Sequence, residues 1–323
     1  MKLLSDSGHS RSGTNSRAAG TELPPAPQPA YSRRVPPDDP QTMPFDRSLR
    51  RLRRDRAALS GADADYLHRR AADELLERLD LVQRPFADAL DLGCGHGYLT
   101  DRLKARGLKV TPADAGPLFA AAVGGLNCDE DRLPFPPASF DLIVSVGVLD
   151  TVNDLPGALL LIRRALRPDG LFLAAFAGAG SLPALRRAMR AAEEAQGGQA
   201  SPRIHPQIDV RAAGDLLGRA GFALPVADVD GVTVRFSSLS RLIGDLRGMG
   251  ATNILGQRGR PLARLGLAAA MADFRDQADP DGKTAERFEI LSVSGWAPSP
   301  DQPQPARRGS GTTSLAEALK PKG

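Results

Sequence analysis

The apolar residues of this chain fall into short strand-like runs that alternate with longer segments of helical periodicity. Strand-like runs occupy residues 87–91, 109–113, 139–146 and 171–176, and a helical segment separates each run from the next. Buried strands of this length with helices between them predict a parallel, doubly wound sheet. Such sheets bind ligands at the carboxyl ends of their strands, so we expect an α/β fold with its site at that edge.

A glycine-rich turn follows the first of these runs. Asp91 ends the strand, Gly93, Gly95 and Gly97 follow at alternate positions, and a helix is expected from Tyr98. Glycine lets a ligand approach the backbone closely, and the next helix offers free N–H groups. The spacing differs from the GxGxxG of dinucleotide-binding turns, because Tyr98 stands where the third glycine would be. A carboxylate at this corner repels a pyrophosphate but suits an amine and a sulfonium. We therefore predict an S-adenosylmethionine loop.

Two acidic positions further along the chain suit the other parts of that cofactor. Asp114 ends the second strand, 23 residues after Asp91, where a carboxylate can accept hydrogen bonds from both ribose hydroxyls. Asp129 lies in an acidic run ahead of the next long strand. It is expected to accept from the adenine amino group, with Leu133 or Phe135 over the ring. The simpler structural alternatives are a turn residue for Asp114 and a solvated loop for the acidic run.

Catalytic groups are less evident than cofactor contacts. Asn153 and Asn253 are candidate substrate contacts, although turn and capping roles are the simpler explanation for both. The four histidines are scattered, and neither a nucleophile–base pair nor a metal-ligand spacing is visible. We expect no metal site and leave the catalytic residue unassigned.

The loop, the ribose position and the acidic run together resemble the class I S-adenosylmethionine-dependent methyltransferases, in their type-11 or BioC-like branch. More narrowly, residues 45–319 are similar to the mitochondrial complex I assembly factor 5 family and its alphaproteobacterial relatives. The glycine loop is specific only to the class I methyltransferase superfamily. Segments 217–222 and 245–253 are the ones that narrow the resemblance to the assembly factor family. The pieces that match are residues 45–47 (FDR) with the basic helix, 65–67 (DYL), 89–95 (ALDLGCG), 133–135 (LPF), 152–156 (VNDLP), 166–170 (LRPDG), 217–222 (LGRAGF), 245–253 (DLRGMGATN) and 308–310 (RGS).

This resemblance implies a seven-stranded, Rossmann-like sheet whose last strand is antiparallel, and a segment after the fifth strand that covers the substrate site. Relatives commonly carry His-Trp after the fourth strand, where this chain has Asp150-Thr151, so the substrate-facing surface is expected to differ. The cofactor contacts that the resemblance implies are Asp91, Gly93, Gly95, Asp114 and Asp129.

We expect a single methyltransferase-fold domain with a helical lid before it and a cap after it, between two tails of low complexity. The predicted segments are a disordered tail (1–42), an N-terminal helical lid (43–86), the S-adenosylmethionine-binding core (87–180), the C-terminal half of the fold with its cap (181–297) and a flexible tail (298–323).

The sequence favours a methyltransferase that acts on a protein or carrier-bound substrate. Transfer of the sulfonium methyl would depend mainly on proximity and orientation, because the cofactor supplies the electrophile. The resemblance leaves two alternatives open. Mitochondrial members are associated with hydroxylation of an arginine on a complex I subunit, and a non-catalytic assembly protein is also compatible. A nicotinamide dehydrogenase is disfavoured because Asp91 and Tyr98 both break its fingerprint.

Composition adds a partner hypothesis. The chain has 323 residues, a net charge of +4 and two cysteines, which is typical of a cytoplasmic protein without a disulfide framework. Neither a secretory signal nor a transmembrane run is expected. A basic cluster could bind an acidic protein or a complex I subunit, and it could make at most a peripheral contact with a membrane. A helix whose charges are simply solvated is the simpler alternative. Binding to nucleic acid is not expected. The cluster consists of Arg47, Arg50, Arg51, Arg53, Arg54 and Arg56.

Overall fold

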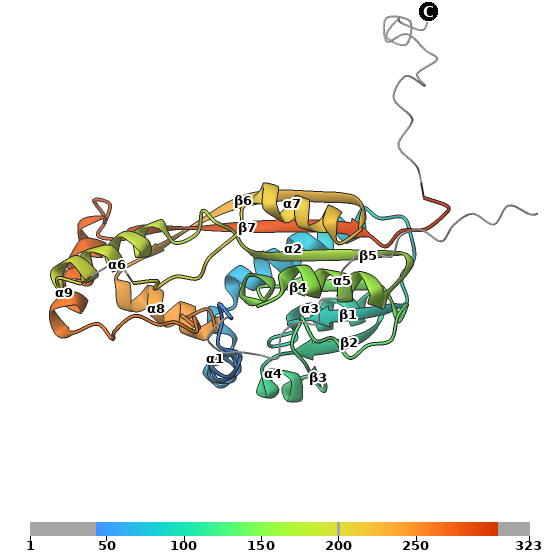
Figure 1. Cartoon of the computed structure of the whole chain (residues 1–323), viewed down its shortest axis with the longest axis horizontal. Helices are drawn as coiled ribbons and strands as arrows, with labels where there is room; N and C mark the ends of the chain where they lie inside the picture. The colour runs from blue at the N-terminus through green and yellow to red at the C-terminus, as the bar shows by residue number, and fades with distance from the viewer. Residues whose placement is uncertain (1–42, 199–200, 303–323) are drawn as a thin grey trace, which may run out of the picture. The chain divides into compact units, whose positions relative to one another are not determined.

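The computed structural model describes residues 43–198 and 201–302. Within this part of the chain, one seven-stranded sheet has the order β3-β2-β1-β4-β5-β7-β6, and β7 runs antiparallel to both neighbours (Figure 1). The α/β fold class and the antiparallel last strand are confirmed. The predicted tail 1–42, and residues 303–323 of the other tail, lie outside the described residues. The strands are β1 (Asp88–Leu92), β2 (Lys109–Asp114), β3 (Leu126–Asn127), β4 (Phe140–Val146), β5 (Leu166–Ala177), β6 (Ala223–Phe236) and β7 (Thr284–Trp296).

Helices cover both faces of the sheet because alternate residues of its buried strands point to opposite sides. Leu90 and Ile143 pack in one cluster with α5 and α7, and the intervening Ala89, Leu142 and Val144 pack in another with α2 and α3. None of the described helices is both long and apolar enough to cross a membrane. The helical elements are α1 (Arg47–Ser60), η1 (Ala62–Ala64), α2 (Tyr66–Asp80), α3 (Tyr98–Ala105), α4 (Pro117–Ala122), η2 (Leu149–Thr151), α5 (Leu155–Ala165), α6 (Pro183–Ala195), α7 (Val210–Arg219), α8 (Leu239–Gly248) and α9 (Arg264–Asp276).

Two strands extend further than the sequence pattern indicates. The proline and glycine of segment 167–170 end helix α5, but β5 already begins at Leu166, with an irregularity in its pairing to β4. The sequence pattern predicts two short strands at 225–228 and 232–236, whereas β6 is continuous over 223–236 and pairs with β7 along its length, with an irregularity between Ala223 and Val226. Hydrogen bonds to the neighbouring strand outweigh the local turn preference of Gly231.

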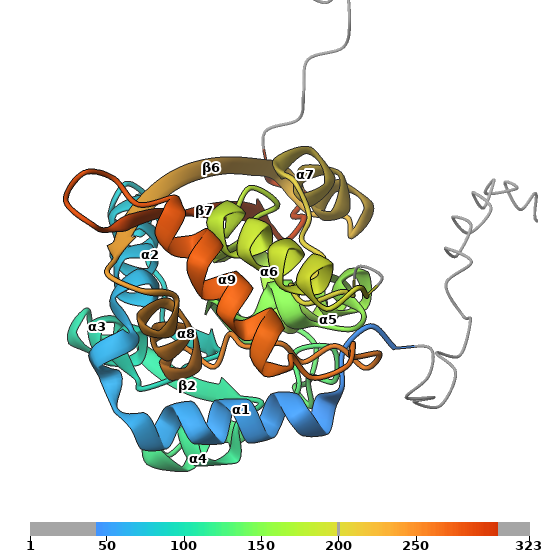
Figure 2. The ribbon, with the colours of Figure 1, turned by 90° about the vertical axis from the view of Figure 1, so that its left-hand side faces the viewer.

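The β6–β7 hairpin reaches beyond the rest of the sheet and carries the cap (Figure 1). Helices α6 and α9 lie side by side on this extension, with α8 next to them (Figure 2). The first turn of α6 is fixed to β7 by Glu286, which is fully buried and accepts hydrogen bonds from Ala184 N (3.1 Å) and Leu185 N (2.8 Å). The carboxylate thus satisfies two N–H groups that a helix start leaves free.

The chain just before α1 is tied to two distant segments. Phe45 forms an isolated antiparallel bridge with Leu255, and Asp46 N donates to Ile254 O at 2.8 Å. The side chain of Asn153 pairs with both backbone groups of Phe45, at 2.9 and 3.0 Å. These contacts hold the start of α1 against both the sheet edge and the cap.

We expect Glu286→Ala to lower the free energy of unfolding by about 2 kcal/mol, because it leaves two buried N–H groups of α6 without acceptors. Glu286→Gln retains one acceptor oxygen and should lose less. Urea denaturation measures the difference, with the exposed Glu194→Ala on α6 as the control. Equal losses for the Ala variants of Glu286 and Glu194 would show that the cap does not depend on this contact.

Candidate functional site

The glycine loop after β1 has the backbone that its sequence predicts. Gly93 and Gly97 have φ of 88° and 84°, in the left-handed region that favours glycine. A Cβ on Gly93 would also lie 2.6 Å from the Val148 side chain. The N–H groups of Gly93 and Cys94 both donate to Ala113 O, which ties the loop to the end of β2. The loop therefore sits at the carboxyl edge of the sheet.

Asp91 is buried beneath this loop. Its side chain accepts one hydrogen bond from Thr100 Oγ1, at 2.6 Å, and is 1% exposed. Burial raises the pKa of Asp91 to about 7, and the nearby Asp114 adds to the rise. A carboxyl group whose pKa lies near 7 changes its protonation state at little free-energy cost, so it can accept a hydrogen bond or bind a cation.

Asp114 stands at the end of β2, as predicted, but its carboxylate is already fully engaged. Arg54 of α1 donates to both oxygens, at 2.6 Å from Nε and in a short contact from Nη2. Gly95 N and Gly116 N donate the other two hydrogen bonds, at 3.0 and 2.7 Å. Burial alone would raise the pKa of Asp114, but the Arg54 guanidinium holds it below its usual value. Four donors fill roughly the four lone-pair sites of a carboxylate.

The acidic run that contains Asp129 is covered by the same helix. Arg50 forms a bidentate pair with Glu130, at 2.7 and 2.8 Å, and both side chains are buried. Arg51 donates to Asp129 at 2.6 Å. Arg47 pairs with Asp131 in the same bidentate way. Four arginines of the basic cluster thus bind carboxylates of their own chain, and α1 packs beside α4 (Figure 2).

The other three residues predicted to lie in the site are Leu133, Asn153 and Asn253, and of these Asn253 alone lines a cavity. Leu133 lies in the core cluster of the sheet and lines neither of the two cavities described next. Asn153 holds the backbone of Phe45, which matches the structural alternative considered for it. Asn253 lines the larger cavity and also donates to Arg203 O at 3.1 Å.

A small cavity of about 40 Å³ lies between the glycine loop and helices α1 and α2. Asp91, Gly93, Gly95 and Arg54 line it. So does His96, whose Nε2 is buried without a hydrogen-bond partner among the described residues. An unpaired polar atom in such a place is costly unless a ligand completes it.

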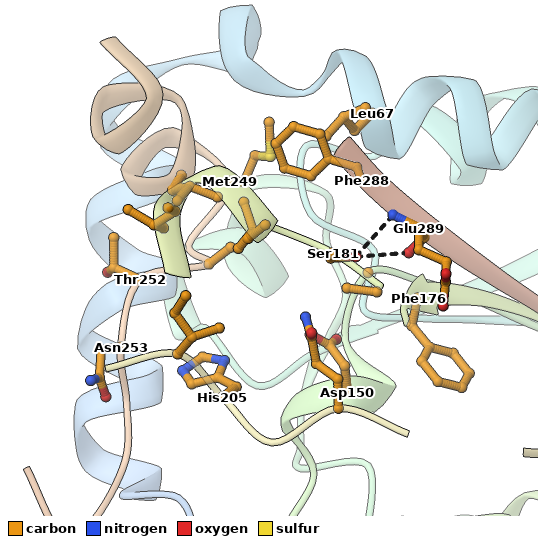
Figure 3. A pocket seen from close by; sticks show the side chains of 18 of the residues that line it. Leu67, Asp150, Phe176, Ser181, His205, Met249, Thr252, Asn253, Phe288 and Glu289 are labelled. Carbon is orange, nitrogen blue, oxygen red and sulfur yellow. Dashed lines mark hydrogen bonds between the residues drawn. The ribbon is translucent and has the colours of Figure 1, made fainter. Parts of the chain in front are cut away.

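A larger cavity of about 370 Å³ opens between the carboxyl edge of the sheet and the cap (Figure 3). Its wall is mainly apolar, with Leu67 of α2, Phe288 of β7 and Met249 after α8 among the side chains that point into it. Asp150 also lines it, and burial raises the pKa of that carboxyl to about 6. Volume and lining are those of a small-molecule site.

His68 of α2 lines both cavities. Its Nδ1 lies 3.2 Å from Asp65 Oδ1, and its Nε2 lies over Gly147 at the end of β4, where a Cβ would collide with the ring. Asp65 fixes Nδ1 as the donor, which leaves Nε2 to accept a proton. Sequence analysis missed this pair, although a three-residue spacing at the start of a predicted helix was its visible signal.

Comparisons with known proteins agree with this geometry. The family described as "Methyltransferase domain" matches residues 90–174. The zebrafish (Danio rerio) protein "Arginine-hydroxylase NDUFAF5, mitochondrial" is 35% identical over 85% of this chain and 89% of its own length. The human protein of the same name is also 35% identical, over 85% and 83%. The chain belongs to the NDUFAF5 family.

Two further likenesses bear on the chemistry and the fold. A "Malonyl-[acyl-carrier protein] O-methyltransferase" of Laribacter hongkongensis is 31% identical to this chain over 79% of it and 90% of that protein. The YcgJ protein of Bacillus subtilis has a TM-score of 0.50 at 14% identity, over 72% of this chain and 100% of its own, and supports the fold alone. The chain is thus similar in sequence to arginine hydroxylases and to a methyltransferase, so these likenesses alone do not decide between the two reactions.

The buried Asp91 carboxyl predicts a pH-dependent stability. Its folded pKa lies above the unfolded value near 4, so its stabilising contribution is lost as the pH rises from about 4 to about 7. Asp91→Asn still accepts from Thr100 and cannot ionise. We expect its free energy of unfolding to match the wild type near pH 4 and to exceed it by up to about 4 kcal/mol at pH 8.

Denaturant titrations across this pH range measure both curves. Asp101→Asn, at an exposed position of α3, is the control and should follow the wild type throughout. Parallel curves for the wild type and Asp91→Asn would contradict the raised pKa.

Proposed function

We propose that this NDUFAF5-family chain is an S-adenosylmethionine-dependent methyltransferase that acts on a protein or carrier-bound acceptor. The observation that carries the proposal is the meeting of two cavities at His68. One lies over the glycine loop with its buried carboxyl groups, and the other is apolar and of ligand size. The first cavity, at about 40 Å³, is too small for the whole cofactor until α1 yields, and a cofactor held there would then face an acceptor in the second cavity across that histidine.

The residues at the sheet edge fit this cofactor chemically. Asp91 and the N–H groups of Gly93 and Gly95 would hold its methionine part, and Asp114 its ribose. Asp129 would accept from the adenine amino group, and Leu133 would pack near the ring. The unpaired His96 Nε2 is a further group that a ligand here would complete. The cofactor, when bound, supplies a methyl group on a sulfonium.

Helix α1 has to yield for the ribose to reach Asp114. All four hydrogen bonds of that carboxylate are in use, and two of them come from Arg54. Ribose hydroxyls are donors to the same oxygens, so Arg54 and the cofactor compete for Asp114. The lid expected over residues 43–86 would then act through this pair.

The other residues orient the reactants and take up a proton. The apolar wall of the larger cavity excludes water and places the acceptor atom toward the smaller cavity. An acceptor that loses a proton on methylation would give it to His68 Nε2, with the resulting charge stabilised by Asp65.

The second candidate function is hydroxylation of an arginine on a complex I subunit. It is favoured by the name of the relatives that match 85% of this chain. The buried Asp150 offers a carboxyl group to a guanidinium in the larger cavity. Four further points stay predictions: a protein partner that binds the basic helix, a peripheral membrane contact, a purely assembly-related role and a cytoplasmic location. On the last point, the NDUFAF5 relatives are themselves named as mitochondrial proteins.

Competition for Asp114 is testable with two variants that change affinity in opposite directions. Arg54→Gln frees the carboxylate and should tighten binding of S-adenosylhomocysteine by about tenfold, although it lowers thermal stability by leaving a buried charge unpaired. Asp114→Asn should weaken binding about 10- to 150-fold, because charge-assisted hydrogen bonds to the ribose are lost.

Isothermal titration gives the affinities, and Arg56→Gln on the exposed side of α1 is the control. Weaker binding by Arg54→Gln would show that Arg54 supports the cofactor rather than competing with it. Failure of the wild type to bind either S-adenosylmethionine or S-adenosylhomocysteine would overturn the proposed function.

The reaction itself is tested by the mass of the product. Incubation of the full chain with S-adenosylmethionine and a candidate acceptor, either a complex I subunit or an acylated carrier protein, should add one methylene unit to the acceptor. His68→Gln should lower kcat by about 100-fold with cofactor affinity retained. Addition of one oxygen atom would instead establish the hydroxylase function.

A further inference from the structure

Arg53 differs from the other partly or fully buried arginines of α1. Its neighbours Arg50 and Arg54 both face carboxylates, whereas Arg53 lines the larger cavity. It is partly buried, and its Nε atom is inaccessible to solvent without a hydrogen-bond partner. Among the described residues no carboxylate pairs with it. A partly buried cation without an anion is unfavourable unless something supplies the charge.

The groups around Arg53 are cations as well. Burial lowers the pKa of Arg53, and Arg56, Arg247 and Arg258 lower it further. Arg247 of α8 is exposed, lines the same cavity and has no carboxylate partner in the described ranges. Arg258 forms a salt bridge of 3.7 Å with Asp46. Arg53 and Arg247 therefore both line this cavity, and Arg56 and Arg258, outside its lining, add to the positive charge around Arg53.

A neutral donor lines the same cavity as these two cations. Thr252 lines the cavity, and its Oγ1 is buried with no hydrogen-bond partner in the described part of the chain. It follows the turn at Gly250, which packs against Arg54 and Ala57 of α1. Two guanidinium groups and an unpaired hydroxyl are the usual ligands of a carboxylate or phosphate.

The rest of the cavity wall is mainly apolar, and among the described residues Asp150 and Glu289 are the carboxyl groups in it. It is formed by Leu67 of α2, Leu185 of α6, Ile243 of α8 and Phe288 of β7, among others. The third arginine of the lining, Arg203, is neutralised by Glu193. A ligand that matches Arg53, Arg247 and the apolar part of the wall therefore has an anionic group and an apolar body.

We propose that the larger cavity binds a molecule with a single anionic head group, a carboxylate or a phosphate, on an apolar body. Arg53, Arg247 and Thr252 hold the head group, and the apolar body lies between α2, α6, α8 and β7. This binding does not depend on the proposed function. The identification of this molecule as the methyl acceptor does rest on the proposed function. As the acceptor, it would react at another group than its anionic head, because Arg53 does not line the smaller cavity whereas His68 lines both.

Four probes with the same alkyl chain test the head group: decanoate, decyl phosphate, decanol and decylguanidine. Isothermal titration of the full chain should show binding of decanoate or decyl phosphate at least about tenfold tighter than that of decanol. The tighter of the two anions identifies the head group. Binding of decanol or decylguanidine as tight as that of both anions would overturn the proposal.

Variants assign the contacts. Arg53→Gln and Arg247→Gln should each weaken binding of the anionic probe about tenfold and leave decanol unchanged, which shows an intact cavity. Thr252→Val should have a smaller effect in the same direction. Arg56→Gln on α1 and Arg241→Gln on α8 remove equal charge from positions that do not line the cavity, and should bind as the wild type does.

Thermal stability supplies a second readout. Arg53→Gln removes a cation that has only cations around it, so its melting temperature should equal or exceed that of the wild type. An unchanged affinity of Arg53→Gln and Arg247→Gln for the anionic probe would overturn the proposal. A parallel titration with S-adenosylhomocysteine keeps this result separate from the proposed function, which fails only if that ligand does not bind.

Discussion

The docking of a basic helix onto a row of acids is the interaction on which the site depends. Helix α1 places Arg47, Arg50, Arg51 and Arg54 against carboxylates that follow β2 and β3, and the innermost pairs are buried. Buried ion pairs add little net stability over apolar packing, but breaking one is costly. They therefore fix where α1 lies more than they strengthen the fold. The same pairs place Arg53 at the larger cavity.

This arrangement gives one helix two roles. One side of α1 neutralises the acids that a cofactor would need, and Arg53 presents positive charge to the larger cavity. Since α1 also forms part of the wall of the smaller cavity, its position influences both binding events. The fold of the sheet is common to proteins with several activities. The lining of the two cavities comes in large part from α1, α2, the cap and the loops at the sheet edge.

The sequence predicted the sheet well and the site in part. Alternation of short apolar runs with helices was enough to place β1, β2 and β4, and the glycine spacing was enough to place the loop. It could not show that Asp114 and Asp129 are bound by arginines far away in the chain, because ion pairs between distant segments have no local signal. The same limit applies to Asn153, which holds the backbone of Phe45, and to the continuous β6, whose turn-like residues are overridden by pairing with β7.

The short bridge between Phe45 and Leu255 has a mechanical consequence. It joins the residue just ahead of α1 to the segment that follows the turn after α8, and Asp46 reinforces it through Ile254. Any displacement of α1 large enough to release Asp114 therefore pulls on the wall of the other cavity. With the two ligands proposed above, entry of one would reshape the space for the other, and the two binding events would be coupled through this backbone bridge.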